Sequence, residues 1–88
     1  MKKRKEERRM KKEYKIQLNS QQEQAAFVKM CCSFAFDVNL HKGSYVVDAK
    51  SLLGVCSMDT TSGCIVKINA SEGQVEKFEE KIKVFLDE

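Results

Sequence analysis

The chain has 88 residues, four cysteines and no proline, with a formal net charge of +3 at pH 7. This length accommodates one small domain with a modest core and excludes a second domain. The charge is unevenly divided, because residues 1–12 hold eight Lys/Arg and two Glu, a net of +6, which leaves residues 13–88 with a net of −3.

The first twelve residues, MKKRKEERRMKK, form a basic tail with almost nothing apolar to bury. This composition predicts a segment that is disordered or extends as a solvated helix. A basic run can keep a protein in solution or bind nucleic acid or an anionic membrane, and composition favours the first role. Met10 is an alternative start of translation. No apolar run is long enough for a signal peptide or a membrane span, which predicts a cytoplasmic protein.

The first regular elements are a strand and a helix. Residues 13–18, EYKIQL, alternate polar and apolar side chains, the pattern of a short half-buried strand. Ser20 with Glu23 three residues later has the pattern of a capping box and predicts a helix that begins near Gln21. The helical stripe expected to face the core comprises Gln24, Phe27, Val28, Cys31 and Phe34.

Residues 36–49 predict a β-hairpin, because apolar and polar residues alternate on each side of a turn at Lys42-Gly43. A short helical piece is expected from Ser51 to about Met58. Residues 63–70, GCIVKINA, then read as another strand whose residues 66 and 68 face the core.

The last segment predicts an amphipathic helix that opens with a capping box formed by Ser71 and Gln74. Its apolar stripe comprises Val75, Phe78, Ile82 and Phe85. The complete order is strand, helix, strand, strand, short helix, strand, helix. This order predicts an α+β fold in which helices cover one face of a single sheet.

The cysteines and the single histidine give no sign of a metal or cofactor site. Cys31 and Cys32 are adjacent, Cys56 and Cys64 are not spaced as a C-x-x-C pair, and no histidine accompanies them. We expect reduced thiols that behave as small apolar residues. His41 lies near the tip of the predicted hairpin, where an exposed strand end is its simplest explanation.

The segments VVDAKSLLGVCSM (46–58) and GCIVKINASEG (63–73), set in a βαββαβα order, resemble HPr, the small histidine-containing phosphocarrier of the bacterial sugar phosphotransferase system. The resemblance covers residues 14–88 and implies an open-faced sandwich, a four-stranded antiparallel sheet with helices on one face. We therefore divide the chain into the basic tail, 1–12, and an HPr-like domain, 13–88.

The resemblance fails where the family carries out its phosphoryl chemistry. HPr proteins present a histidine, an arginine and a proline where the first strand meets the first helix, and the imidazole takes the phosphoryl group. Here that place reads LNSQQEQAAF (18–27), without His, Arg or Pro. Ser20 is expected to act as the helix cap, and Glu23 would repel a phosphate. We therefore expect no catalytic residue, no metal and no enzymatic activity.

Ser51 has two compatible interpretations. As the N-cap of the short helix, its hydroxyl would accept a hydrogen bond from a free backbone N–H group. In the HPr family the matching serine is phosphorylated by a dedicated kinase in many Gram-positive bacteria, and the apolar patch beside it binds partners. The resemblance thus implies a phosphorylation site at Ser51 and a partner-binding surface that comprises Lys50, Leu52, Leu53, Val55 and Met58.

Two functional hypotheses follow. The first is a non-catalytic HPr-like regulator or adaptor, similar in logic to the catabolite-repression HPr-like proteins of bacilli. Its expected partner is a phosphotransferase-system component, an HPr kinase or a transcription regulator, and the exposed patch would permit a monomer or a weak homodimer. The alternative is a scaffold whose basic tail binds nucleic acid or anionic membrane. It ranks second because the body lacks the aromatic sheet residues of RNP motifs.

Overall fold

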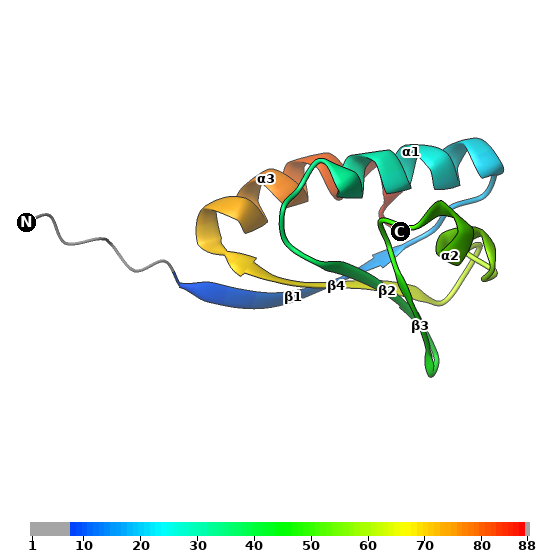
Figure 1. Cartoon of the computed structure of the whole chain (residues 1–88), viewed down its shortest axis with the longest axis horizontal. Helices are drawn as coiled ribbons and strands as arrows, with labels where there is room; N and C mark the ends of the chain where they lie inside the picture. The colour runs from blue at the N-terminus through cyan, green and yellow to red at the C-terminus, as the bar shows by residue number, and fades with distance from the viewer. Residues whose placement is uncertain (1–7, 88) are drawn as a thin grey trace, which may run out of the picture.

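The computed structural model describes residues 8–87. Its elements are β1 (Arg9–Ile16), α1 (Gln21–Cys32), β2 (Val38–Lys42), β3 (Tyr45–Asp48), α2 (Leu52–Cys56), β4 (Cys64–Ser71), α3 (Glu72–Ile82) and a final 3₁₀ turn, η1 (Lys83–Phe85). The four strands form one antiparallel sheet in the order β1-β4-β2-β3. The helices lie on one side of it (Figure 1), which confirms the predicted α+β open-faced sandwich.

Each helix begins at the serine that the sequence predicts as its cap. The Ser20 hydroxyl accepts from the N–H of Glu23 at 3.1 Å, and the Ser71 hydroxyl accepts from the N–H of Gln74 at 3.3 Å. Gln74 also accepts from the Ser71 N–H, so this capping box is complete. At α1 the Glu23 carboxylate instead accepts from the N–H of Asn19 at 2.7 Å, one residue before the cap.

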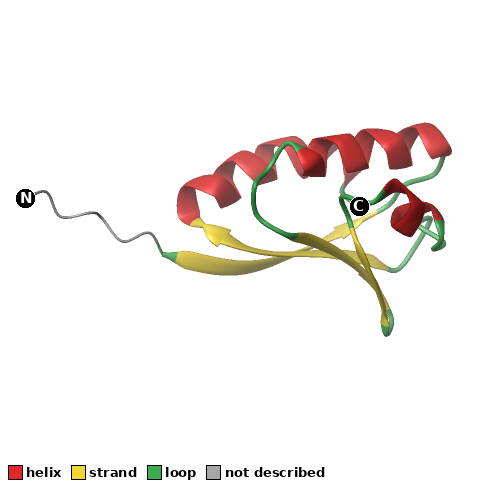
Figure 2. Cartoon of the chain, in the orientation of Figure 1, coloured by secondary structure: helices red, strands yellow, loops and turns green. Residues whose placement is uncertain are grey.

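The core lies between the sheet and the two long helices (Figure 2). Phe78 of α3 is fully buried and contacts the rings of Tyr14, Phe34 and Phe36, while Phe27 of α1 packs edge-on against Phe85. Val66 and Ile68 are buried as predicted, and Lys67 between them is exposed. The opposite face of the sheet has no helix over it within residues 8–87.

Strand β1 is longer than predicted and corrects the expected end of the tail. It begins at Arg9 and pairs with β4 along its whole length, from Arg9 opposite Ser71 to Ile16 opposite Cys64. Residues 9–12 are therefore part of the sheet and are neither disordered nor helical. Their charges are compatible with a strand because alternate side chains point to the uncovered face, where they stay in water. Residues 1–7 of the predicted tail lie outside the described residues.

The hairpin turn lies one residue later than predicted. Lys42 pairs with Tyr45, so the two loop residues are Gly43 and Ser44. Gly43 has a φ of +61°, which an L side chain rarely adopts, whereas Ser44 has a negative φ. A glycine at the first of two loop positions is the pattern of a type II′ turn, whose twist matches that of the flanking strands.

Candidate functional site

The junction between β1 and α1, which holds the phosphorylated histidine in HPr proteins, is held here by hydrogen bonds between its own polar groups. The Leu18 N–H donates to the Thr60 carbonyl at 2.8 Å, and the buried Thr60 hydroxyl donates to the Leu18 carbonyl at 2.9 Å. The Gln24 side-chain amide donates to the Thr60 hydroxyl at 3.0 Å and accepts from the Cys56 thiol at 3.2 Å. These bonds connect the start of α1 to the loop after α2.

A depression of about 290 Å³ lies over this junction, and its chemistry is neutral apart from one carboxylate. Its described lining residues are Leu18, Asn19, Ser20, Gln21, Gln24, Cys56, Met58, Asp59, Thr60 and Thr61, a set without a histidine, lysine or arginine. Hydrogen bonds from Thr61, and then the Lys42 ammonium, lower the pKa of the Asp59 carboxyl. The Lys42 ammonium, 3.5 Å from the Asp59 carboxylate, offsets its charge, and the lining residues themselves offer a phosphoryl group no cation.

His41 cannot supply the missing imidazole at this junction. It lies on β2, paired with Ile65 of β4 and Val46 of β3, next to the buried Leu40. Because side chains alternate along a strand, His41 points to the uncovered face, where it is half-buried and not the fully exposed strand end that the sequence predicts. The helices, and with them the depression at Ser20, are on the other side of the sheet.

The segment around Ser51 is a short helix held against the edge of the sheet. The Ser51 hydroxyl accepts from the N–H of Gly54 at 3.1 Å, so the predicted cap is confirmed. Gly54 lies against β3: a Cβ atom there would meet the Val47 Cβ at 3.3 Å and the Ser51 hydroxyl at 3.4 Å. The glycine therefore allows α2 to lie close to the strand while Ser51 remains half-buried.

The five residues predicted to bind a partner divide into two groups. Leu53 is 86% exposed and Leu52 46% exposed, as a docking surface requires. Val55 is 0% exposed and Met58 7% exposed, so both belong to the core and the expectation for them is wrong. The reason is that α2 packs on α1 as well as on β3, which buries Val55, and that Met58, two residues after the end of the helix, joins the core cluster.

Lys50 is also placed differently from the expectation. Its ammonium donates to the Phe34 carbonyl at 2.7 Å and so points toward the connection between α1 and β2. The backbone N–H of Lys50 donates to the Asp48 carboxylate at 2.9 Å. Lys50 therefore fixes the turn that leads into α2, and its charge does not lie free beside Leu53.

Tyr45 is a member of this surface that sequence analysis missed. It is 51% exposed on edge strand β3, and its hydroxyl lies 3.0 Å from the Ser57 hydroxyl at the end of α2. Period-two alternation after the hairpin turn puts Tyr45 and Val47 on the same face, and this signal could have revealed it. We use the name α2 face for Tyr45, Ser51, Leu52 and Leu53.

The cysteines divide between core and surface. Cys31 and Cys64 are buried, and burial is the main reason that the pKa of each thiol is raised, to about 12 for Cys31. Cys32 and Cys56 are exposed free thiols. Within residues 8–87 no three His, Cys, Asp or Glu side chains are grouped as metal ligands would be. No helix in this range has the length and hydrophobicity to cross a bilayer.

Comparison with known proteins identifies the family. A search of curated proteins gives no match. A phosphocarrier protein HPr from Bacillus anthracis has 22% sequence identity, with a TM-score of 0.63 over 90% of this chain and 98% of its own. HPr-C-His from Thermoanaerobacter tengcongensis has 23% identity and a TM-score of 0.58 over 86% of this chain and 91% of its own.

At these identities the two structures establish the fold alone. The family model described as "PTS HPr component phosphorylation site" matches residues 12–88, nearly the whole chain. The match therefore includes the junction without a histidine, the α2 face, the whole of β2, β3 and β4, and β1 from Lys12 onward. The chain belongs to the HPr family of the phosphotransferase system.

Proposed function

We propose that this chain is a non-catalytic HPr-family adaptor that binds a protein partner through the α2 face. The observation that carries the proposal is the composition of the β1–α1 junction, whose described lining residues include neither an imidazole nor a cation. Ser20 is engaged as a helix cap, and a phosphoserine ester transfers its phosphoryl group far less readily than a phosphohistidine. A family member of this composition can be recognised without passing phosphate along.

The α2 face supplies the means of recognition. Leu52 and Leu53 of α2 and Tyr45 of the adjacent strand β3 expose apolar surface, while Val55 and Met58 pack in the core. Apolar side chains that a small domain leaves exposed together are typical of protein–protein contacts. The expected partners are a component of the phosphotransferase system, an HPr kinase or a transcription regulator, and the proposed role is cytoplasmic.

Phosphorylation of Ser51 is the proposed gate. A phosphate there would add a charge of about −1.5 to −2 next to Leu52 and Leu53 and would replace the cap hydroxyl that now accepts from Gly54. Lys50, the adjacent cation, can pair with this phosphate only by leaving the Phe34 carbonyl. Phosphorylation would therefore change both the charge of the α2 face and the contact that fixes its leading turn.

Phosphoryl transfer tests the non-catalytic part of the proposal. The chain is incubated with phosphoenolpyruvate and enzyme I, and intact mass is measured, with an ordinary bacillar HPr as the positive control. We expect the control to gain one phosphoryl group while this chain gains none. An acid-labile phosphoramidate on this chain would overturn the proposal.

A Ser-specific HPr kinase tests the gate. We expect mass spectrometry to locate one phosphate on Ser51, and the Ser51→Ala variant to remain unmodified. Ser20, also a helix cap, serves as the internal control because no exposed leucine follows it. An unmodified Ser51 under conditions that label an ordinary HPr would remove phosphorylation from the proposal and leave the docking surface to be tested separately.

The docking surface is tested with two exposed apolar residues. Leu53 is 86% exposed on α2, and Val84, 81% exposed on η1, provides a matched control outside the α2 face. Binding of enzyme I and of a bacillar HPr-binding transcription regulator is measured by calorimetry. We expect Leu53→Asp to weaken binding at least tenfold and Val84→Asp to change it less than twofold. Equal effects of the two substitutions, or no binding by the unmodified chain, would contradict a docking role for α2.

A further inference from the structure

The uncovered face of the sheet carries a stripe of positive charge that the proposed function does not use. Side chains of β1 alternate, with Ile16 buried and Tyr14 packed on the core, so Arg9, Lys11 and Lys15 point away from the helices. Lys67 of β4 joins them because it pairs with Glu13, which has the same orientation. We use the name basic stripe for Arg9, Lys11, Lys15 and Lys67.

The stripe is positioned by the sheet itself. The Arg9 guanidinium donates to the Asn69 carbonyl at 3.0 Å, which holds it across β4. The Lys67 ammonium lies 3.6 Å from the Glu13 carboxylate, the one acid on this side of β1. Asp37 also lines a depression beside the stripe, so the four cations against the carboxylates of Glu13 and Asp37 leave a net charge of +2. Arg9 and Lys15, the two ends of the stripe on β1, are six residues apart and therefore about 20 Å from each other along the strand.

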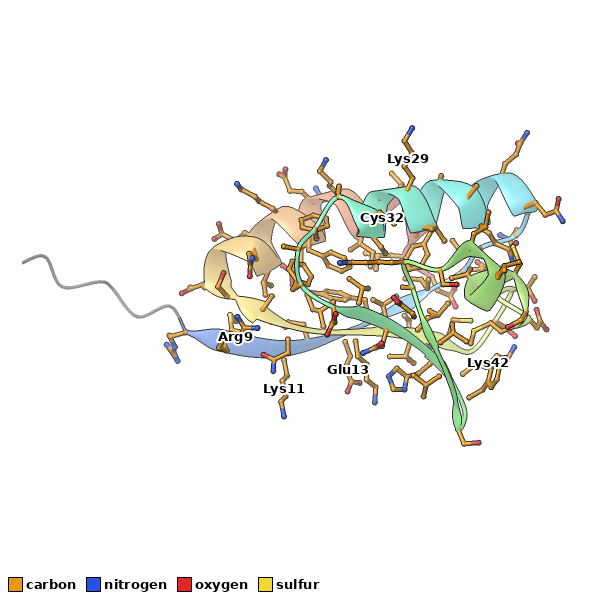
Figure 3. The ribbon with its side chains drawn as sticks, in the orientation of Figure 1. Arg9, Lys11, Glu13, Lys29, Cys32 and Lys42 are labelled. Atoms are coloured by element: carbon orange, nitrogen blue, oxygen red, sulfur yellow. The ribbon has the colours of Figure 1, made fainter. Side chains whose placement is uncertain are left out.

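A depression with a volume of about 660 Å³ adjoins the stripe. Arg9, Lys11 and Lys67 line it together with Asn39 and Asn69, and its other lining residues include the acids Glu13 and Asp37 and the rings of Phe36 and His41. The amide groups of these two asparagines can donate to and accept from sugars and base edges. Figure 3 shows Lys11 and Glu13 projecting from the side opposite the helices, whereas Lys29 projects from the helical side.

Continuity with the N-terminal residues extends the positive charge. The stripe begins at Arg9, and the sequence immediately before it contains Lys2, Lys3, Arg4, Lys5 and Arg8 against Glu6 and Glu7. The sequence alone attributes all of this charge to a tail. The structure assigns its last part, from Arg9 onward, to a rigid surface with fixed spacing.

We propose that the basic stripe and its depression bind single-stranded nucleic acid. A linear polyanion suits a linear array of cations, and releases counterions when it binds. A membrane surface is less suitable because, of the exposed large apolar side chains in residues 8–87, only Val46 faces this side. Duplex readout uses a helix or β-ribbon in a groove, but the stripe lies on β1 and β4 and not on the protruding β2–β3 hairpin. The chain would then join a nucleic acid on one face to a protein on the other.

The side chains of the stripe and its depression predict how the affinity for nucleic acid depends on base sequence and on salt. Stacking of bases contributes strongly in many single-strand binders, but Tyr14 packs on the core and Phe36, which lines the depression, is itself buried, which leaves the half-buried His41 as the one ring of the depression that a base could contact. Binding should therefore be indifferent to sequence, weak at physiological salt and steeply dependent on salt concentration.

Fluorescence anisotropy with labelled 12-nucleotide RNA and DNA single strands tests the proposal over a salt series. The double variant Lys11→Gln/Lys67→Gln removes two charges from the stripe. The control Lys29→Gln/Lys77→Gln removes two charges from exposed positions on the helical side. At low salt we expect at least tenfold weaker binding for the stripe variant and less than twofold for the control. The log–log salt slope should fall by about 1.4 for the stripe variant only, at about 0.7 per phosphate contact.

Three outcomes would overturn the proposal. Equal losses in the two double variants would mean that net charge and not the stripe determines binding. Displacement of the oligonucleotide by polyglutamate at matched charge, or binding only to vesicles of anionic lipid, would assign the surface to another class of partner. Loss of all binding on deletion of residues 1–7, with Lys11 and Lys67 still present, would assign the binding to residues 1–7 alone. Failure here would leave the α2 proposal intact, because its test uses the other side of the sheet.

Discussion

Two serines in this molecule make the same local contact in different surroundings. The Ser20 hydroxyl caps α1 by accepting from the N–H of Glu23 at 3.1 Å, and the Ser51 hydroxyl caps α2 by accepting from the N–H of Gly54 at 3.1 Å. Around Ser20, the polar side chains of Gln24 and Thr60 are bonded to one another. Beside Ser51, Leu52 and Leu53 are exposed.

This difference shows why the cap geometry alone does not decide function. At the junction the available polar groups serve the fold, so little remains for a ligand to contact. At α2 the fold is held by Val55 and Met58, and the neighbouring leucines add exposed apolar surface that folding does not need. The candidate site is thus the region whose exposed groups are not required for stability.

The largest expected effect is a stability contrast between two leucines, one from each region. Leu18 at the junction is 1% exposed, so Leu18→Ala should lower the free energy of unfolding by about 2–5 kcal/mol through lost burial and a cavity. Leu53→Ala on α2 should change it by less than about 0.5 kcal/mol because Leu53 is mostly in water. Urea denaturation followed by circular dichroism measures both.

Measurements of partner binding add a second comparison between the two leucines. Leu53→Ala should weaken partner binding while leaving the unfolding midpoint unchanged. A Leu53→Ala variant that unfolds as readily as Leu18→Ala would show that α2 needs this side chain for folding, and would contradict the division between the two regions.

The next effect compares the two caps directly. Ser20→Ala and Ser51→Ala should each lower the free energy of unfolding by about 1 kcal/mol, since each leaves a backbone N–H without its acceptor. Ser51→Asp should recover most of this loss because a carboxylate is also a good cap. Kinase labelling distinguishes the two sites: Ser20→Ala should be phosphorylated as the unmodified chain is.

If Ser51→Ala were as stable as the unmodified chain, the serine would not be needed as a cap. If Ser20→Ala abolished labelling at Ser51, the kinase would also recognise the β1–α1 junction, and the junction and the α2 face would not be independent.

Local sequence patterns predicted the elements that local chemistry determines. Ser20, Ser51 and Ser71 cap their helices because a hydroxyl three residues before an N–H group needs no distant partner. Val66 and Ile68 alternate with Lys67 as any half-buried strand does. These features are fixed within four or five residues, so the sequence contains enough information to find them.

The errors concern features that depend on contacts far along the chain. Val55 is buried because α2 packs against α1, which a count of apolar residues in a short helix does not reveal. Lys50 bonds to the Phe34 carbonyl, sixteen residues away. Arg9 and Lys11 belong to a strand because β4 pairs with them, although their composition resembles a solvated tail. The basic stripe was missed for the same reason.

The smallest expected effect concerns two adjacent cysteines that repeat the contrast between buried and free groups. Burial raises the pKa of the Cys31 thiol from the ordinary 9.0 to about 12, whereas Cys32 is exposed. The unfolded chain therefore loses the Cys31 proton near pH 9 while the folded chain retains it, so the free energy of unfolding should fall as pH rises above 9. Urea midpoints at pH 8, 9 and 10 measure this slope.

The pH range stops at 10 because burial and the hydrogen bond to Glu79 also raise the pKa of Tyr14, which adds a loss of the same sign above the ordinary tyrosine value of 10.0. Cys31→Ala should reduce the slope between pH 8 and 10 and leave the part due to Cys64, whose pKa burial also raises, even though it lowers stability at every pH. Cys32→Ala is the comparison and should reduce the slope less than Cys31→Ala does, because the neighbouring Cys32 is a smaller cause of the raised Cys31 pKa than burial is. Equal slopes in the two variants would mean that Cys31 ionises as readily in the folded chain as in the unfolded one. The two cysteines of α1 would then not differ as a buried and an exposed thiol.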